Sequence, residues 1–235
     1  ADVVHISPSH HFPTGTVTPA SRRYELLGWA AKQKGRYIIE DEYDSEFRLV
    51  GNPIPALQSI DASDKVIYMN TFSKSLSSTI RISYMVLPIP LMVRYNHILS
   101  FYACTVSNFD QYTLTRFIQE GYLEKHINRM RKFYRNSRDR ILGCIRSHRL
   151  YPQVTIKEEN AGLHFLMEID TSYTDREMVD RAAAAGINIS SLSQYCHGKE
   201  QEDSHTLVIN YSGIEEDIIE EACDRLLESV VHLTT

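Results

Sequence analysis

One lysine of this sequence stands among small hydroxyl side chains, in the segment Asn70-Thr-Phe-Ser-Lys-Ser-Leu76. A lysine such as Lys74 can form a Schiff base with an aldehyde once its amine is neutral, and nearby cations lower its pKa toward that form. The hydroxyl groups of Thr71 and Ser73 and the guanidinium of Arg81 suit a phosphate group, because all of them donate hydrogen bonds. The segment therefore indicates Schiff-base chemistry beside a phosphate.

A second segment with chemical potential is acidic and begins in an apolar run, Tyr37-Ile-Ile-Glu-Asp-Glu-Tyr-Asp-Ser-Glu-Phe47. A carboxylate at the carboxyl end of a buried strand, such as Asp41, can keep the nitrogen of a pyridine ring protonated. That proton makes the ring an electron sink. The hydroxyl group of Tyr43 can donate to a phenolic oxygen on the same ring. The two segments together suggest a site for a phosphorylated pyridine aldehyde.

Each of these features has a simpler explanation when it is taken alone. Asp41, Glu42 and Asp44 can form a solvated loop, and a lysine in a serine-rich loop is usually a surface residue. Arg81 can make a structural ion pair. Because the segments fall at the ends of consecutive predicted strands, we favour a shared site.

The elements that must position these residues alternate between strand and helix in the first part of the chain. Apolar runs predict strands at residues 3–6, 37–39, 66–69 and 80–87. Thr18-Pro19 predicts an N-cap, with a helix that stops at Gly35. The alternation predicts a largely parallel sheet covered by helices, in which ligands bind at the carboxyl ends of the strands.

The pattern changes in the second part of the chain. Apolar spacing from Leu123 to Ile145 predicts a long helix. Strands are predicted at residues 162–169 and 206–211, and the capping boxes Thr174-x-x-Glu177 and Ser212-x-x-Glu215 predict two helix starts. We expect an α/β fold with a partial large domain, connecting helices and a small C-terminal α+β domain, at residues 1–108, 109–150 and 151–235.

The long helix also has a basic face, formed by Arg129, Arg131, Lys132, Arg135, Arg138 and Arg140. This face could bind an anion or form an interface. A basic face on a long helix is more often solvated, so we favour that interpretation.

The composition is that of a globular protein, with 43% hydrophobic and 23% charged residues and a net charge of -5. The negative charge argues against nucleic-acid binding as the main role of this chain. The four cysteines include no C-x-x-C pair and do not resemble a disulfide framework, which favours a reducing, cytoplasmic location. No apolar run is long enough for a membrane helix. The start of the sequence, with no initiator Met and an immediate apolar run, leads us to expect an upstream part.

Four segments together resemble the MocR subfamily of GntR-type transcriptional regulators. They are Ser7-Pro-Ser-His-His-Phe-Pro-Thr-Gly15, Ile38-Ile-Glu-Asp-Glu-Tyr-Asp-Ser-Glu-Phe-Arg48, Pro53-Ile-Pro-Ala-Leu57 and Tyr68-Met-Asn-Thr-Phe-Ser-Lys-Ser-Leu76. In that family a winged helix-turn-helix precedes a domain similar to fold-type I aminotransferases. The resemblance runs from about Val3 to the C-terminus. It implies a pyridoxal 5'-phosphate cofactor and a homodimer.

The resemblance also implies roles for individual residues. Lys74 would carry the cofactor as a Schiff base, Asp41 would pair with the pyridine nitrogen, and Tyr43 would contact the phenolic oxygen. The phosphate or the neighbouring substrate side would be lined by Thr71, Ser73 and Arg81. His10 lies in the loop where aminotransferases carry an Asn-Pro-Thr-Gly block.

The sequence departs from ordinary transaminases at two places. Phe12 stands before Pro13-Thr14-Gly15, where transaminases have Asn, and this agrees with the regulator subfamily. The stretch from His205 to Tyr211 has no arginine for a substrate carboxylate. The glycine-rich phosphate turn and the aromatic residue that stacks on the ring are expected upstream of Ala1.

Three hypotheses follow from these observations. The first is an effector-sensing and dimerisation domain of a regulator, which binds pyridoxal phosphate or an amino compound and reaches DNA only through an upstream winged helix-turn-helix. The second is a true class I/II aminotransferase without its N-terminal part. The third is an oligomerisation module that has lost its cofactor. Phe12 favours the first over the second, and the retention of Lys74, Asp41 and Tyr43 favours the first over the third.

Overall fold

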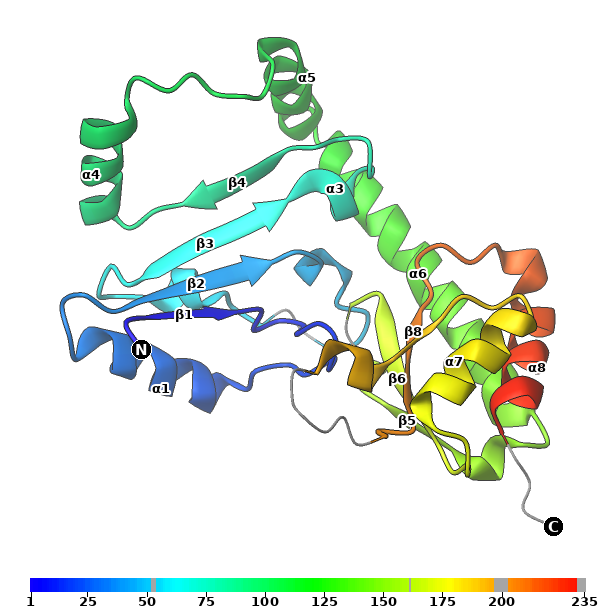
Figure 1. Ribbon diagram of the computed structural model, residues 1–235. Coiled ribbons are helices and arrows are strands. Elements are labelled where there is room, and N and C mark those ends of the chain that lie inside the picture. Colours follow the sequence, from blue (N-terminus) through cyan, green and yellow to red (C-terminus); the bar gives the residue numbers. More distant parts are fainter. Residues whose placement is uncertain (52–53, 161, 197–202, 232–235) are drawn as a thin grey trace. The chain divides into compact units, whose positions relative to one another are not determined.

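The structure is a computed structural model that describes residues 1–51, 54–160, 162–196 and 203–231, and it has two compact units (Figure 1). Unit 1 comprises Ala1–His11, Thr16–Glu46 and Gly51–Met130, and unit 2 comprises Phe12–Gly15, Phe47–Val50 and Arg131–Thr235. Each unit has a sheet of its own. The expected α/β fold is confirmed, whereas the expected domain boundaries at residues 108 and 150 stay a prediction. Pro53, the first residue of one segment quoted above, lies outside the described residues.

The sheet of unit 1 has four strands in chain order. They are β1 (Val3–Ile6), β2 (Tyr37–Glu42), β3 (Val66–Thr71) and β4 (Ser83–Val86). The first three strands are parallel, and β4 pairs with β3 in the antiparallel direction. The prediction of a largely parallel sheet is therefore correct. The acidic residues 40–42 belong to β2 itself and not to the loop after it.

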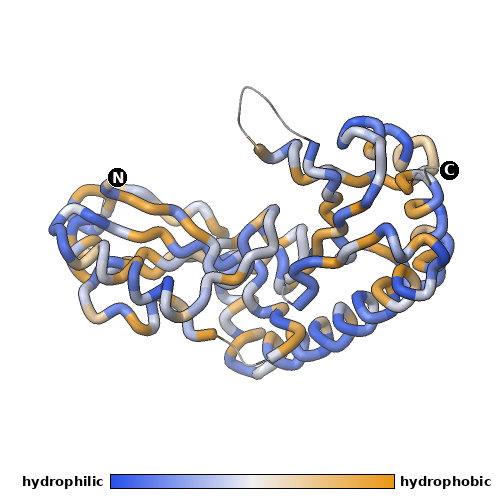
Figure 2. The backbone as a smooth tube through the Cα atoms, turned by 90° about the horizontal axis from the view of Figure 1, so that it is seen from below, coloured by the Kyte–Doolittle hydropathy of each residue, from blue (hydrophilic) through white to orange (hydrophobic). Residues whose placement is uncertain are grey.

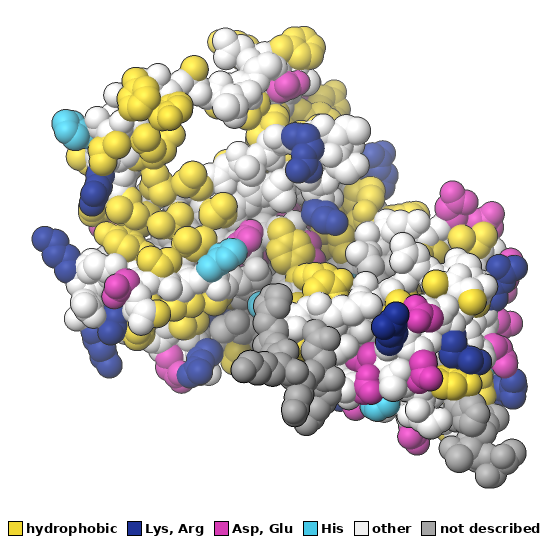
Figure 3. Space-filling model, viewed as in Figure 1, with side chains coloured by type: hydrophobic (Ala, Val, Ile, Leu, Met, Phe, Trp, Pro, Cys, Tyr) yellow, Lys and Arg dark blue, Asp and Glu magenta, His cyan; other side chains and the backbone are white. Residues whose placement is uncertain are grey.

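The two faces of this sheet differ in what covers them. Helices α1 (Ala20–Ala31) and α2 (Leu57–Ile60) contact β2 and β3, and they form a core with Ala30, Ile38 and Val66. Because successive strand residues point to opposite faces, His5 and Asp41 belong to the other face. Figure 3 shows hydrophobic side chains gathered over that face of the sheet.

Helix α1 begins differently from the prediction. Its N-cap residue is Pro19, and no side chain caps it. Thr18 uses its carbonyl oxygen instead, which accepts a hydrogen bond from Nε of Arg23 at 3.0 Å. The helix ends at Ala31, before Gly35. The expected Thr18 cap is therefore wrong, and the backbone amide of Thr18 donates instead to the carbonyl oxygen of Pro8 at 2.8 Å.

Three helices follow β3 and β4 in unit 1, namely α3 (Phe72–Ser75), α4 (Ile89–Leu99) and α5 (Asn108–Gln119). Ser107 caps α5 by accepting from the backbone amide of Asp110 at 3.1 Å. Helices α4 and α5 have no buried residue, and large apolar side chains are exposed on them and between them, such as Phe109 on α5 and Phe101 after α4. This segment is held by few tertiary contacts within the described chain.

Unit 2 contains an antiparallel sheet in the order β5-β6-β8-β7. Its strands are β5 (Val154–Lys157), β6 (His164–Ile169), β7 (Ser190–Ser191) and β8 (Thr206–Asn210). Its helices are α7 (Asp175–Ala184), α8 (Ile219–Val230) and most of α6 (Tyr122–Ser147), which starts within unit 1. Figure 2 shows hydrophobic residues concentrated in the strands and recurring at intervals along α6.

The two predicted capping boxes have different outcomes. Thr174 and Glu177 form the box at the start of α7, with both reciprocal hydrogen bonds present. Ser212 does not cap a helix, because its hydroxyl group donates to Oδ1 of Asn210 at 2.8 Å. Helix α8 starts only at Ile219, after a 3-10 turn. The spacing of a capping box therefore identified one helix start correctly and one wrongly.

The basic face of α6 is partly used inside the protein. Nε of Arg135 donates to the carbonyl oxygen of Leu49 at 3.1 Å, and Arg138 is buried beside Asp139 and the carbonyl of Glu159. Arg140 pairs with Glu220 at 3.0 Å. The expectation of a simple solvated face is therefore wrong for Arg138. None of the described helices combines the length and the apolar composition that crossing a bilayer demands.

Candidate functional site

Asp41 lies near the end of β2, on the sheet face opposite to α1 and α2. Its Oδ2 is 3.1 Å from Nε2 of His5 on β1, and its side chain is 36% exposed. The register of the parallel pair β1 and β2 brings these two residues to the same face. The sequence analysis did not identify His5, because the partner of a strand residue depends on a register that no local pattern specifies.

Tyr43 follows β2 directly and is half-buried. Its hydroxyl oxygen is 3.3 Å from Nδ1 of His10. Burial, and then the negative charges of Asp44 and Asp41, raise the pKa of Tyr43 above its ordinary value of 10. Tyr43 therefore keeps its proton and remains able to donate a hydrogen bond.

Two carboxylates after Asp41 hold the loop that contains His10. Nδ1 of His10 is 2.8 Å from Oδ2 of Asp44, and both side chains are buried. The hydroxyl group of Ser9 donates to Oε1 of Glu42 at 2.7 Å. Asp44 was not among the predicted site residues. Its spacing of two residues from Glu42 is the available signal, because alternate residues of an extended segment share a face.

Thr71, Ser73 and Arg81 come together as predicted from their donor groups. The hydroxyl group of Thr71 lies 3.1 Å from that of Ser73, and it also accepts from the backbone amide of Ser73. Nη1 of Arg81 donates to the hydroxyl oxygen of Ser73 at 3.3 Å. These residues lie where β3 runs into α3 and where the chain returns toward β4.

Lys74 lies in α3 and is exposed. Within the described part of the chain it forms no ion pair with Asp41. The two residues are instead related through the sheet, since Asp41 pairs with Met69 on β3 and β3 leads directly into α3. The structure therefore brings Lys74 and Asp41 to the carboxyl ends of neighbouring parallel strands without joining them.

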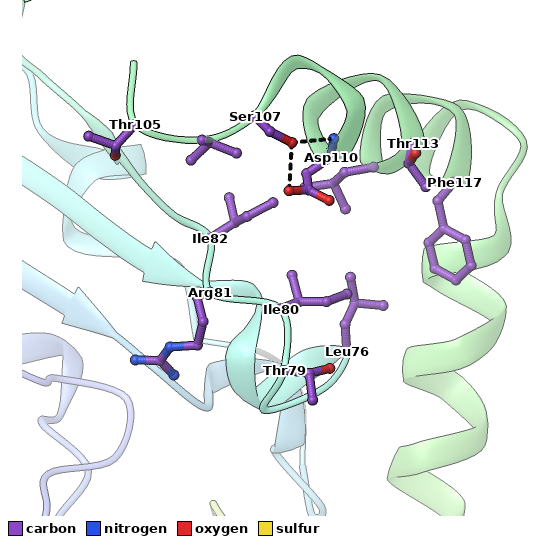
Figure 4. A pocket seen from close by; sticks show the side chains of 12 residues that line it. Leu76, Thr79, Ile80, Arg81, Ile82, Thr105, Ser107, Asp110, Thr113 and Phe117 are labelled. Carbon is purple, nitrogen blue, oxygen red and sulfur yellow. Dashed lines mark hydrogen bonds between the residues drawn. The ribbon is translucent and has the colours of Figure 1, made fainter. Parts of the chain in front are cut away.

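A cavity of about 490 Å³ lies behind the loop that follows Lys74 (Figure 4). Its lining comes from this loop, from α5 and from the residues just before α5, and it combines apolar side chains such as Leu76, Ile80 and Phe117 with polar ones such as Thr79 and Asp110. Figure 4 shows Arg81 directed away from the other labelled side chains. Arg81 lines this cavity and also donates to Ser73, so the cavity adjoins the hydroxyl and guanidinium cluster.

Comparison with protein families defines the class of this chain. Residues 3–226 match the model of the family described as aminotransferase class I and II. The chain belongs to this family. Its structure is similar to that of kynurenine aminotransferase from Pyrococcus horikoshii, solved in complex with PMP, with a TM-score of 0.84 and 28% identity over 98% of this chain and 56% of that one. The fold-type I expectation is thereby confirmed.

Several relatives in sequence are regulators. The HTH-type transcriptional regulator YdeL of Bacillus subtilis is 41% identical over 226 residues, which are 96% of this chain and 48% of the relative. The probable rhizopine catabolism regulatory protein MocR of Rhizobium meliloti is 32% identical over 98% of this chain and 46% of its own length. The resemblance to MocR regulators is confirmed, and the chain spans about half the length of these relatives.

Proposed function

We propose that this chain is the effector-sensing and dimerisation domain of a transcriptional regulator that binds pyridoxal 5'-phosphate. The observation that carries the proposal is the similarity to YdeL and MocR over nearly the whole chain, together with the retained Lys74, Asp41 and Tyr43. In this proposal DNA is bound through an upstream winged helix-turn-helix, and the complete protein is a homodimer. The effector is the cofactor itself or an amino compound.

The groups around Lys74 fit the proposed cofactor by their chemistry. Thr71, Ser73 and Arg81 already form one cluster of hydroxyl and guanidinium donors, the set that a phosphate dianion accepts. Asp41 offers a partly exposed carboxylate for a pyridine nitrogen. Tyr43 keeps its proton and can donate to a phenolic oxygen.

The cofactor, when bound, would supply an electron-accepting ring and an aldehyde carbon. This chain's residues would supply the rest. Lys74 would link the cofactor covalently as a Schiff base, and Asp41 would hold a proton on the ring nitrogen. His10 would help to position the hydroxyl group of Tyr43, since its imidazole lies 3.3 Å from that oxygen. An amino compound that competes with Lys74 for the aldehyde would then be a chemically reasonable effector.

A true class I/II aminotransferase is the alternative function. The similarity to kynurenine aminotransferase, at 28% identity and a TM-score of 0.84, favours this alternative. The stretch from His205 to Tyr211 argues against it, because it offers no arginine for a substrate carboxylate.

The complete protein, with all sequence upstream of Ala1, separates the two functions. We would measure specific duplex binding with and without pyridoxal phosphate, and amino-group transfer from a panel of amino acids to a 2-oxo acid. A regulator should bind a specific duplex, with an affinity that the cofactor or an amino acid alters, and should show negligible transfer. Efficient transfer without specific duplex binding would establish the aminotransferase.

A further inference from the structure

A buried arginine organises the loop that precedes α1. Arg23 is 1% exposed, and its guanidinium donates to three carbonyl oxygens, those of Thr18 at 3.0 Å, Pro55 at 2.8 Å and Pro8 at 2.9 Å. A fourth contact reaches the hydroxyl oxygen of Ser9 at 3.5 Å. Because these partners come from both ends of the loop and from the segment before α2, Arg23 ties Pro8 and Thr18 to Pro55.

Glu42 continues this network on the covered side of the sheet. It is 3% exposed and accepts from the hydroxyl group of Ser9 at 2.7 Å. Its neighbour on the same face, Glu40, accepts instead from the backbone amides of Leu57 and Gln58 at the start of α2. Glu42 is therefore the strand carboxylate that is bonded to the loop, whereas Glu40 is bonded to a helix.

The two residues joined by the hydrogen bond between Ser9 and Glu42 are each adjacent in sequence to residues of the candidate site. Ser9 precedes His10, and Glu42 stands between Asp41 and Tyr43. Nδ1 of His10 reaches the hydroxyl oxygen of Tyr43 at 3.3 Å, so the distance between the two side chains depends on how the loop is seated against β2. The hydrogen bond between Ser9 and Glu42 joins the residue before His10 to the residue before Tyr43, so it restricts the position of the loop relative to β2.

We propose that Glu42 and Arg23 are positioning residues that act through Ser9 to hold His10 against Tyr43. Nothing in this role requires Glu42 or Arg23 to touch a ligand. The inference rests on the proposed function only in its second step, in which the held pair of His10 and Tyr43 sets the affinity for pyridoxal phosphate.

The charges around Glu42 are consistent with a role as a hydrogen-bond acceptor. Besides burial, the pKa of Glu42 is raised by the charge of Glu40 on β2 and lowered by hydrogen bonds from Ser9 and Ser45 and by the charge of Arg23 on α1. Burial is the main cause that raises the pKa of Glu42, to about 7. Glutamine keeps a carbonyl oxygen in place of the carboxylate oxygen, so it can still accept from the hydroxyl group of Ser9.

The test compares Ser9→Ala, Glu42→Ala and Glu42→Gln in the complete protein. The first readout is structural: the ring resonances of His10 and the hydrogen exchange rate of the Thr18 amide. The second readout is the affinity for pyridoxal phosphate, measured by titration through the absorbance that depends on Lys74. The Thr18 amide reports on the loop because it donates to the carbonyl oxygen of Pro8 at 2.8 Å. Asp61→Asn is the control, since Asp61 is also a carboxylate that accepts hydrogen bonds, but from the backbone amides of Lys65 and Val66 at the start of β3.

We expect Ser9→Ala to shift the His10 resonances, to speed exchange at Thr18 and to weaken cofactor affinity about fivefold, the effect of one ordinary hydrogen bond. Glu42→Ala should do the same or more, and Glu42→Gln should stay within about twofold of the wild type. Ser9→Ala keeps the test decisive if Glu42→Ala fails to fold. Asp61→Asn should leave both readouts unchanged.

Unchanged His10 resonances and Thr18 exchange in Ser9→Ala would overturn the proposal. Loss of affinity in Glu42→Gln equal to that in Glu42→Ala would also overturn it, because the acceptor would then be irrelevant. If the wild type shows no absorbance that depends on Lys74, the proposed function fails. In that case the His10 and Thr18 readouts still decide whether Glu42 holds the loop.

Discussion

Nδ1 of His10 lies 2.8 Å from Oδ2 of Asp44, and the two side chains are only 1% and 3% exposed. This buried pair joins the loop before α1 to the segment after β2, 34 residues further along the chain. A buried polar group that loses its partner is costly, and a hydrogen bond to a charged group contributes about 1.5–3 kcal/mol.

Asp44→Asn should therefore lower the free energy of unfolding by about 2 kcal/mol, as measured by urea denaturation. Asp64→Asn, the same change at a surface turn with a positive φ of 53°, is the control and should stay within about 0.5 kcal/mol of the wild type. Equal effects of the two substitutions would show that the His10–Asp44 pair contributes nothing specific.

Lys74→Ala should abolish the visible absorbance that a lysine-bound pyridoxal phosphate produces, because the alanine has no amine to form the Schiff base. The measurement is an absorbance spectrum of the complete protein after addition of pyridoxal phosphate. Lys65→Ala is the matched control, since Lys65 precedes the same strand and its amine binds the carbonyl oxygens of Gln33 and Lys34. An unchanged band in Lys74→Ala would remove Lys74 from its proposed role.

Asp41→Asn should weaken the affinity for pyridoxal phosphate by at least about tenfold, or about 1.4 kcal/mol, because the amide cannot hold a proton on the ring nitrogen by its charge. A larger loss would be expected of a fully buried carboxylate, but the side chain of Asp41 is 36% exposed. Titration of the complete protein with the cofactor measures the change. His5→Ala tests whether the partner of Asp41 matters, and wild-type affinity in Asp41→Asn would place Asp41 outside the site.

Glu42 should make the stability of the protein depend on pH in a predictable direction. Its pKa in the folded protein is about 7, above the ordinary value of 4.5, so the folded state binds this proton more tightly than the unfolded state. The stabilisation is complete below about pH 4.5 and is lost as the pH rises through about 7. The difference between these two pKa values corresponds to a change of roughly 3 kcal/mol in the free energy of unfolding, at 1.36 kcal/mol for each pKa unit.

The free energy of unfolding of the wild type relative to Glu42→Gln should accordingly fall as the pH rises from about 4.5 to about 7. Denaturation curves at several pH values measure this difference, and Glu25→Gln on the surface of α1 is the control for removing one carboxylate. A difference that rises with pH would contradict the sign derived from the burial of Glu42.

The cysteines should differ in their reactivity toward a thiol reagent at about pH 8. Cys104 and Cys196 are exposed, whereas Cys223 is buried and its pKa is raised to about 12, mainly by burial. The thiolate is the reactive form, so Cys223 should be modified last. Mass spectrometry of the labelled protein would resolve the order, and rapid labelling of Cys223 in a Cys104→Ser, Cys196→Ser variant would contradict it.

Local patterns in the sequence determined much of this protein. The apolar runs placed β1, β2 and β3, and the alternation of strands with helices predicted a mostly parallel sheet. The Thr174 capping box placed the start of α7 because both of its hydrogen bonds are made within four residues. The residue types around Lys74 identified the donor cluster of Thr71, Ser73 and Arg81, since these groups are close in sequence as well as in space.

Only the tertiary structure decided the relationships between distant segments. His5 beside Asp41 depends on strand register, and the pairs of Ser9 with Glu42 and of His10 with Asp44 depend on how a loop folds back onto β2. Burial is likewise a property of the whole fold, because the acidic residues that could be read as a solvated loop include Glu42 and Asp44, both 3% exposed. Sequence patterns record neighbours along one chain segment, whereas the desolvation and pairing of charges depend on every segment that packs against them.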